Sequence, residues 1–164
     1  MTTRIAAIIA VIVFAVALPF SRADVATGMA AYDAGDYETA YNEWLPLAEQ
    51  GSPSAQFNLS LLYRYGKGRP VDSKTAAAWC LKAADAGFVP AQYEMAKIYE
   101  AGEGVRQNSV EAHKFYKLAA EQRYRDAKKL KKQLAKTMTS TQLAHAEMWL
   151  REWKKARKAE SQNE

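Results

Sequence analysis

The chain has 164 residues, of which 49% are hydrophobic and 25% charged, proportions that are typical of a folded domain and exclude wholesale disorder. Its single cysteine, Cys80, excludes an intrachain disulfide, and two histidines are too few for an ordinary zinc cluster. The net charge of +5 is uneven: residues 24–122 hold 9 Lys/Arg and 13 Asp/Glu, and residues 123–164 hold 12 and 5. We expect no metal, no cofactor and no disulfide-linked partner.

Residues 1–23 have the features of an export signal. Arg4 supplies a positive charge, an uninterrupted apolar run follows, and small residues stand where a signal peptidase would cleave before Asp24. We therefore predict a periplasmic or secreted protein. The alternative is retention in the inner membrane through residues 5–21, because these 17 uncharged residues are at the lower limit for spanning a bilayer.

A stretch in the middle of the chain occurs twice, 36 residues apart. Each copy has a glycine, then Ala-Gln followed by an aromatic residue, then a tyrosine and a G-x-G triplet. The matching pairs are Gly51 and Gly87, Ala55 and Ala91, Gln56 and Gln92, Tyr63 and Tyr99, Gly66 and Gly102, and Gly68 and Gly104. A constant period of this length indicates stacked supersecondary units.

Three units, at about 25–50, 51–86 and 87–122, each predict two helices. A side chain that caps helices recurs at one position in each unit and marks the second helix; these residues are Asp36, Asp72 and Asn108. The glycines before them end the first helix. Residues with helical spacing are expected to face the core, among them Met29, Tyr32, Leu59, Trp79, Cys80, Met95 and Phe115.

The repeat decays after residue 122, where we predict capping helices over 123–158. Arg123 replaces the glycine that begins the earlier units, so we expect the array to end there. The next helix has Ala127, Leu130 and Leu134 on its inner side, and the T-x-x-Q pattern from Thr139 begins a last helix. Residues 159–164 are expected to be a disordered tail, and the whole array to contain about seven helices.

The pattern resembles the Sel1-like repeat family, relatives of the tetratricopeptide repeats. The resemblance rests on the 36-residue period, on A-x-x-x-L-x-x-x-Y at 55–63 and A-x-x-x-M-x-x-x-Y at 91–99, and on G-x-G in both loops, and it covers about residues 28–156. It implies an all-α fold, an α/α superhelical solenoid of antiparallel helix pairs with a C-terminal capping helix. It also implies an adaptor that binds another protein.

The candidate partner-binding face lies on the first helices, opposite the core positions. Its members are Phe57, Leu61, Arg64, Tyr93, Lys97 and Glu100. In solenoids the inner helices line a concave groove, where exposed aromatic side chains act as rigid anchors. We therefore expect Phe57 and Tyr93 to be exposed; the alternative is that they pack against neighbouring repeats.

A second candidate surface is the basic side of the helix after residue 126, formed by Lys128, Lys129, Lys132 and Lys136. It predicts docking on an anionic envelope surface, against the alternative of a merely solvated face. Nucleic acid is not an expected partner of an exported protein.

No pattern in the chain indicates an enzyme. S-x-x-K, G-x-S-x-G and G-x-x-x-x-G-K are all missing from the sequence. Cys80 falls at a core position, which predicts an inert thiol, and His113 is expected to be partly exposed and non-catalytic. Together with the export signal, the resemblance to Sel1-like repeats implies an exported protein–protein interaction module.

Overall fold

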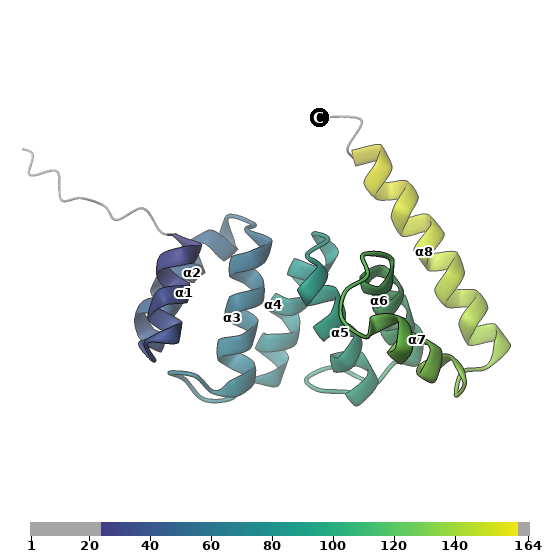
Figure 1. The fold of residues 1–164 in the computed structure, drawn as a ribbon, viewed down its shortest axis with the longest axis horizontal. Coiled ribbons are helices and arrows are strands. Elements are labelled where there is room, and N and C mark those ends of the chain that lie inside the picture. The colour runs from purple at the N-terminus through teal and green to yellow at the C-terminus, as the bar shows by residue number, and fades with distance from the viewer. Residues whose placement is uncertain (1–23, 161–164) are drawn as a thin grey trace, which may run out of the picture.

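The computed structural model describes residues 24–160, so the predicted signal at 1–23 and the last four residues lie outside it. The described part is a stack of eight helices in chain order, with the two ends of the array far apart (Figure 1). The helices are α1 (Val25–Asp33), α2 (Tyr37–Glu49), α3 (Pro53–Tyr65), α4 (Ser73–Asp85), α5 (Val89–Ala101), α6 (Ser109–Glu121), α7 (Ala127–Ala135) and α8 (Ser140–Glu160).

The all-α solenoid is confirmed, with one helix more than the seven expected. Helices α1 to α6 form three pairs, and each pair packs on the next. Helix α8 runs through residues 159 and 160, which the sequence assigned to the tail. None of the helices between residues 24 and 160 has the length and apolarity needed to cross a membrane.

The predicted caps begin the second helix of each pair. The Asp36 carboxylate accepts a hydrogen bond from the backbone N–H of Thr39 at 3.1 Å. Asp72 and Asn108 accept equivalent bonds from the first turns of α4 and α6. The free backbone N–H groups at the start of α2, α4 and α6 thus find acceptors in a side chain that recurs every 36 residues.

The second glycine of each G-x-G triplet lets successive units approach. A Cβ on Gly68 would lie 2.7 Å from the Cβ of Tyr37, and one on Gly104 would lie 2.0 Å from the carbonyl oxygen of Ser73. Both glycines also have positive φ angles, of 70° and 74°. Any side chain here would therefore collide with the preceding unit and strain the backbone.

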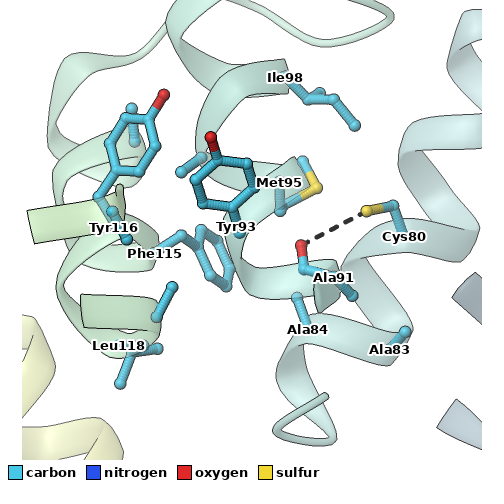
Figure 2. Packing of buried hydrophobic residues seen from close by; sticks show 14 of the residues in the cluster. Cys80, Ala83, Ala84, Ala91, Tyr93, Met95, Ile98, Phe115, Tyr116 and Leu118 are labelled. Carbon is cyan, nitrogen blue, oxygen red and sulfur yellow. Dashed lines mark hydrogen bonds between the residues drawn. The ribbon is translucent and has the colours of Figure 1, made fainter. Parts of the chain in front are cut away.

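The core divides into two clusters, one shared by α2 and α3 and a larger one that extends from α4 to α8. Alanines bring the backbones together, and larger side chains such as Met95 and Phe115 fill the space between them (Figure 2). Three expected core positions differ: Met29 is 41% exposed, and Tyr32 and Trp79 are only half-buried. On α1 it is Gly28 that is buried, because the Trp44 ring lies against it.

The C-terminal cap departs from the repeat. Helices α7 and α8 both pack on α6 instead of forming a fourth regular pair. Thr139 and Gln142 form the predicted capping box, with backbone to side-chain bonds of 2.8 and 3.2 Å. Arg123 has a φ of 56°, so it takes the left-handed conformation that glycine has at residues 51 and 87. The turn persists although the glycine is lost.

Candidate functional site

The structure brings three of the six predicted partner-binding residues together. Arg64, Lys97 and Glu100 line a hollow of about 370 Å³, which we call the central hollow. Its other lining residues are Ala101, Tyr116 and Leu130. Side chains from α3, α5, α6 and α7 therefore converge on one surface depression. Leu61 is half-buried on α3 and is not among the lining residues.

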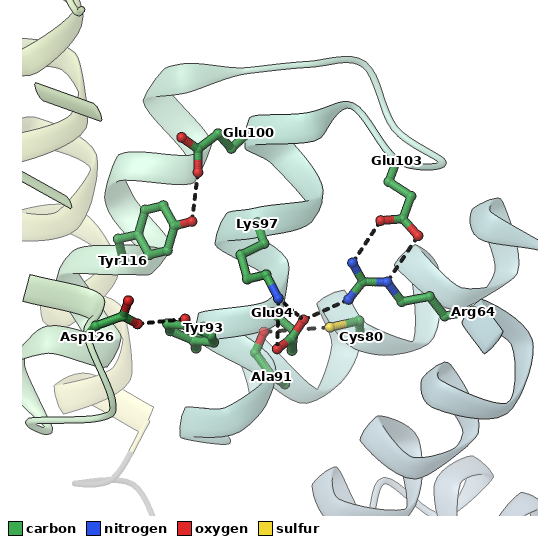
Figure 3. A network of polar contacts seen from close by, with 10 residues as sticks. All are labelled: Arg64, Cys80, Ala91, Tyr93, Glu94, Lys97, Glu100, Glu103, Tyr116 and Asp126. Atoms are coloured by element: carbon green, nitrogen blue, oxygen red, sulfur yellow. Dashed lines mark hydrogen bonds and ion pairs between the residues drawn. The ribbon is translucent and has the colours of Figure 1, made fainter. Parts of the chain in front are cut away.

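Arg64 is held at the edge of the central hollow by two carboxylates (Figure 3). Its guanidinium donates to both oxygens of Glu103, at 3.0 and 2.8 Å, and to Glu94 at 2.7 Å. Burial opposes its charge, but the bonds to Glu103 and Glu94 outweigh it and raise the pKa of Arg64 above its ordinary value. Arg64 therefore joins the two repeats and has little charge left to offer a partner.

Lys97 and Glu100 provide the accessible charges of the central hollow. The Lys97 side chain is 41% exposed, and its ammonium lies 3.2 Å from Glu94. Glu100 is exposed, and one of its oxygens accepts a 2.7 Å hydrogen bond from the Tyr116 hydroxyl. Burial, and then this bond, raise the pKa of Tyr116. The hollow therefore presents one cation and one anion above an apolar wall formed by Leu130.

The prediction that Phe57 and Tyr93 are exposed anchors is wrong. Tyr93 is 7% exposed, and its hydroxyl donates to Asp126 at 2.7 Å (Figure 3). Phe57 is half-buried, and its ring centroid lies 5.5 Å from that of Phe88. Both aromatic side chains pack against the next element of the array, which was the alternative expectation. Of the six candidates, only Lys97 and Glu100 present accessible charge in the hollow.

The four predicted surface lysines lie around a second depression, of about 620 Å³, along α7. We call it the basic hollow; it is lined by Arg125, Asp126, Lys128, Lys129, Lys132, Gln133 and Lys136. All four lysines are exposed, and none forms an ion pair with any residue between 24 and 160. Docking on an anionic envelope surface stays a prediction.

Cys80 and His113 are both buried. Cys80 is 1% exposed, and burial raises its thiol pKa to about 12, so its predicted core position is confirmed. His113 was expected to be partly exposed, but it is 4% exposed because the cap covers α6. Burial, and then the nearby Lys131 ammonium, lower the pKa of His113.

Two buried glutamines hold consecutive units together, and the sequence analysis assigned them no role. The Gln56 amide donates to the carbonyl oxygen of Ala48 at 3.0 Å, and Gln92 donates to that of Ala84 at 3.3 Å. Each thereby satisfies a carbonyl near the end of the preceding helix. The recurring Ala-Gln-aromatic triplet was the signal that could have revealed this role.

Comparison with known proteins accounts for the 36-residue period. Residues 53–88 and 89–124 each match the family model described as Sel1 repeat. None of the curated proteins compared with the chain matches it significantly.

Two solved structures are similar to the described fold. One is a protective antigen present in uropathogenic Escherichia coli strains that displays an SLR fold, with 28% identity and a TM-score of 0.72 over 77% of this chain and 28% of that one. The other is a Sel1 repeat protein from Oxalobacter formigenes, with 38% identity and a TM-score of 0.61 over 63% of this chain and 43% of that one. The chain thus spans less than half the length of either structure.

Sel1 repeats generally serve as protein–protein interaction modules. The matching repeats include α3 to α6, which supply every lining residue of the central hollow except Leu130 of α7. The chain therefore contains two Sel1 repeats, at residues 53–88 and 89–124, and its described fold is similar to the SLR fold.

Proposed function

We propose that this protein is an exported interaction module that holds a segment of a partner protein across its inner helices, α3, α5 and α7. The observation that carries the proposal is the central hollow. It gathers Arg64, Lys97 and Glu100, all at positions that differ between the two repeats. Residues that are free to vary within a repeated scaffold are the ones that can encode a specific partner.

The central hollow favours a segment of mixed polarity. Lys97 can pair with a carboxylate of the partner, and Glu100 can accept a second donor beside the Tyr116 hydroxyl. Leu130 offers a half-buried apolar contact. The rigid Arg64 bridge fixes the distance between α3 and α5, so the groove is largely formed before binding. Binding alone accounts for this arrangement, with no covalent chemistry.

Export is part of the proposal and has a separate test. The support is the sequence of residues 1–23, with its charged start, apolar run and small residues before Asp24. We expect the protein recovered from its producing cell to begin near Asp24 and to fractionate outside the cytoplasm. N-terminal sequencing of an intact protein that still begins at Met1 would reject cleavage.

Site-specific crosslinking in the producing cell tests the groove. A photo-crosslinking residue is placed at Lys97 or, as a control, at Ala78, which is exposed on α4. We expect a discrete adduct from position 97 and none of that mass from position 78. Equal adducts from both positions, or none from position 97, would contradict the proposal.

A further inference from the structure

We propose that a second copy of this chain docks its first helix pair on the basic hollow, so that molecules associate head to tail. This inference goes beyond the binding of a partner in the central hollow and uses different residues. It rests on two sets of unpaired charges that lie at opposite ends of the array.

The basic hollow carries five cations and a single carboxylate. That carboxylate, on Asp126, already accepts the Tyr93 hydroxyl at 2.7 Å. Lys128, Lys129, Lys132 and Lys136 are exposed, without an ion pair to any described residue. An anionic occupant would offset the self-repulsion of this concentration of like charge around one depression.

The first helix pair provides an acidic surface. Residues 24–50 contain six Asp/Glu and no Lys/Arg. None of the six forms an ion pair within residues 24–160. Asp33, Glu38 and Glu49 are exposed and are not used as helix caps. Met29, which is 41% exposed on the same pair, adds an apolar contact at this open end.

The two surfaces cannot meet within one molecule. Helices α1 and α2 begin the stack, whereas α7 lies at its other end (Figure 1). They therefore complement each other only between copies. Because the surfaces are different patches, the contact is heterologous and leaves one acidic and one basic surface free for a further copy.

A second copy of the chain would pair more of the unpaired lysines and carboxylates than an anionic bilayer would. Docking on lipid would neutralise the basic hollow but would leave the six carboxylates of residues 24–50 without cations. Head-to-tail contact offsets both sets at once. The basic hollow is also a depression, which suits the projecting edge of a helix pair better than a flat surface does.

Sedimentation of two end-neutralised variants tests the proposal. One variant carries Asp33→Asn, Glu38→Gln and Glu49→Gln; the other carries Lys128→Gln, Lys129→Gln and Lys132→Gln. We expect the purified wild-type protein to associate at low ionic strength and to do so about tenfold more weakly near 0.3 M salt. Each variant alone should be monomeric. Mixed in equal amounts, the two should form a species of two chains and nothing larger, because each retains one intact end.

Several results would overturn the inference. They are a monomeric wild-type protein at low salt, a variant that associates as the wild type does, or a mixture that stays monomeric. Binding of monomeric protein to vesicles of anionic phospholipid would instead place a bilayer at the basic hollow. Lys74→Gln is the matched control; Lys74 is exposed on α4, and its substitution should leave association unchanged. Circular dichroism checks that each variant is folded. Lys97→Glu should also leave association intact, which separates this test from that of the central hollow.

Discussion

The two Sel1 repeats have equivalent cores and different inner faces. Leu59 and Met95, 36 residues apart, are both 0% exposed. On the inner face, Leu61 corresponds to Lys97, and Arg64 to Glu100. The residues that hold the helices together therefore recur every 36 residues. The positions that a partner can contact vary between the two repeats.

The element that packs against each repeat also determines which contacts its residues make. Phe57 and Tyr93 are equivalent, yet Phe57 packs on Phe88 at the start of α5, whereas Tyr93 bonds to Asp126 of the cap. An equivalent position thus makes a simple apolar contact in one repeat and a polar anchor in the other, because a different element packs against it in the stack.

The largest expected effect concerns a feature that the repeats share. Gly104→Ala should destabilise the fold by about 3 kcal/mol or more, because the new Cβ would lie 2.0 Å from a carbonyl oxygen in addition to the strain of a φ of 74°. Gly68→Ala should behave similarly. Gly51→Ala is the control: its φ is 92° but nothing lies within 4 Å, so about 1 kcal/mol is expected. Urea unfolding measures all three, and equal losses would show that unit contact is not what requires glycine.

A smaller effect tests an equivalent position at which the two repeats make different contacts. Tyr93→Phe makes the second repeat like the first and should cost about 1 kcal/mol at neutral pH, since it leaves Asp126 without its donor. Burial, and then the bond to Asp126, raise the pKa of Tyr93 from 10.0 to about 12. A raised folded-state pKa means that the neutral hydroxyl stabilises the fold below pH 10 and that this stabilisation is lost as the pH rises to about 12.

The gap in unfolding free energy between wild type and Tyr93→Phe should therefore narrow between pH 10 and 12. Tyr65→Phe is the matched control, because Tyr65 is 55% exposed and no described residue accepts a hydrogen bond from its hydroxyl. A gap that widens with pH would contradict the assigned role of the Tyr93 hydroxyl.

The smallest effect concerns the junction after the second repeat. Arg123→Gly restores the residue found at positions 51 and 87 and should stabilise the fold by about 0.5 to 1 kcal/mol, because Arg123 has a φ of 56°. Thermal unfolding gives the difference. Arg106→Gly is the control and should not stabilise the fold, because Arg106 is exposed and does not itself have a positive φ. A destabilised Arg123→Gly variant would mean that the Arg123 side chain itself supports the cap.

The period made the repeated features predictable from the sequence. Asp36, Asp72 and Asn108 were identified as caps because one position must satisfy the same free N–H groups in every unit. The core positions of α3 and α5 followed from helical spacing in the same way. Residues that interact with the unrepeated cap had no such signal. Tyr93 and His113 are buried by segments beyond residue 123, and a period says nothing about where those segments fold.

The central hollow was only partly predictable. Arg64 and Glu100 were chosen as variable inner positions, and both line the hollow. The carboxylates that neutralise Arg64 come from positions 94 and 103, near its repeat-equivalent at 100, so the period could have suggested them. Tyr116 enters the hollow from the second helix of its pair, and side-chain direction across two helices is set by packing that the sequence pattern does not specify.

Selection of a protein partner by the variable charges of the central hollow has a direct test. A photo-crosslinking residue is placed at Ala101, an exposed residue that lines the central hollow, and the adduct yield is measured in cells that carry Lys97→Glu or the control Lys74→Glu. We expect Lys97→Glu to abolish the adduct and Lys74→Glu to preserve it, because Lys74 is an exposed residue of α4 outside the hollow. An adduct that survives Lys97→Glu, or that is lost equally with Lys74→Glu, would contradict recognition through the hollow.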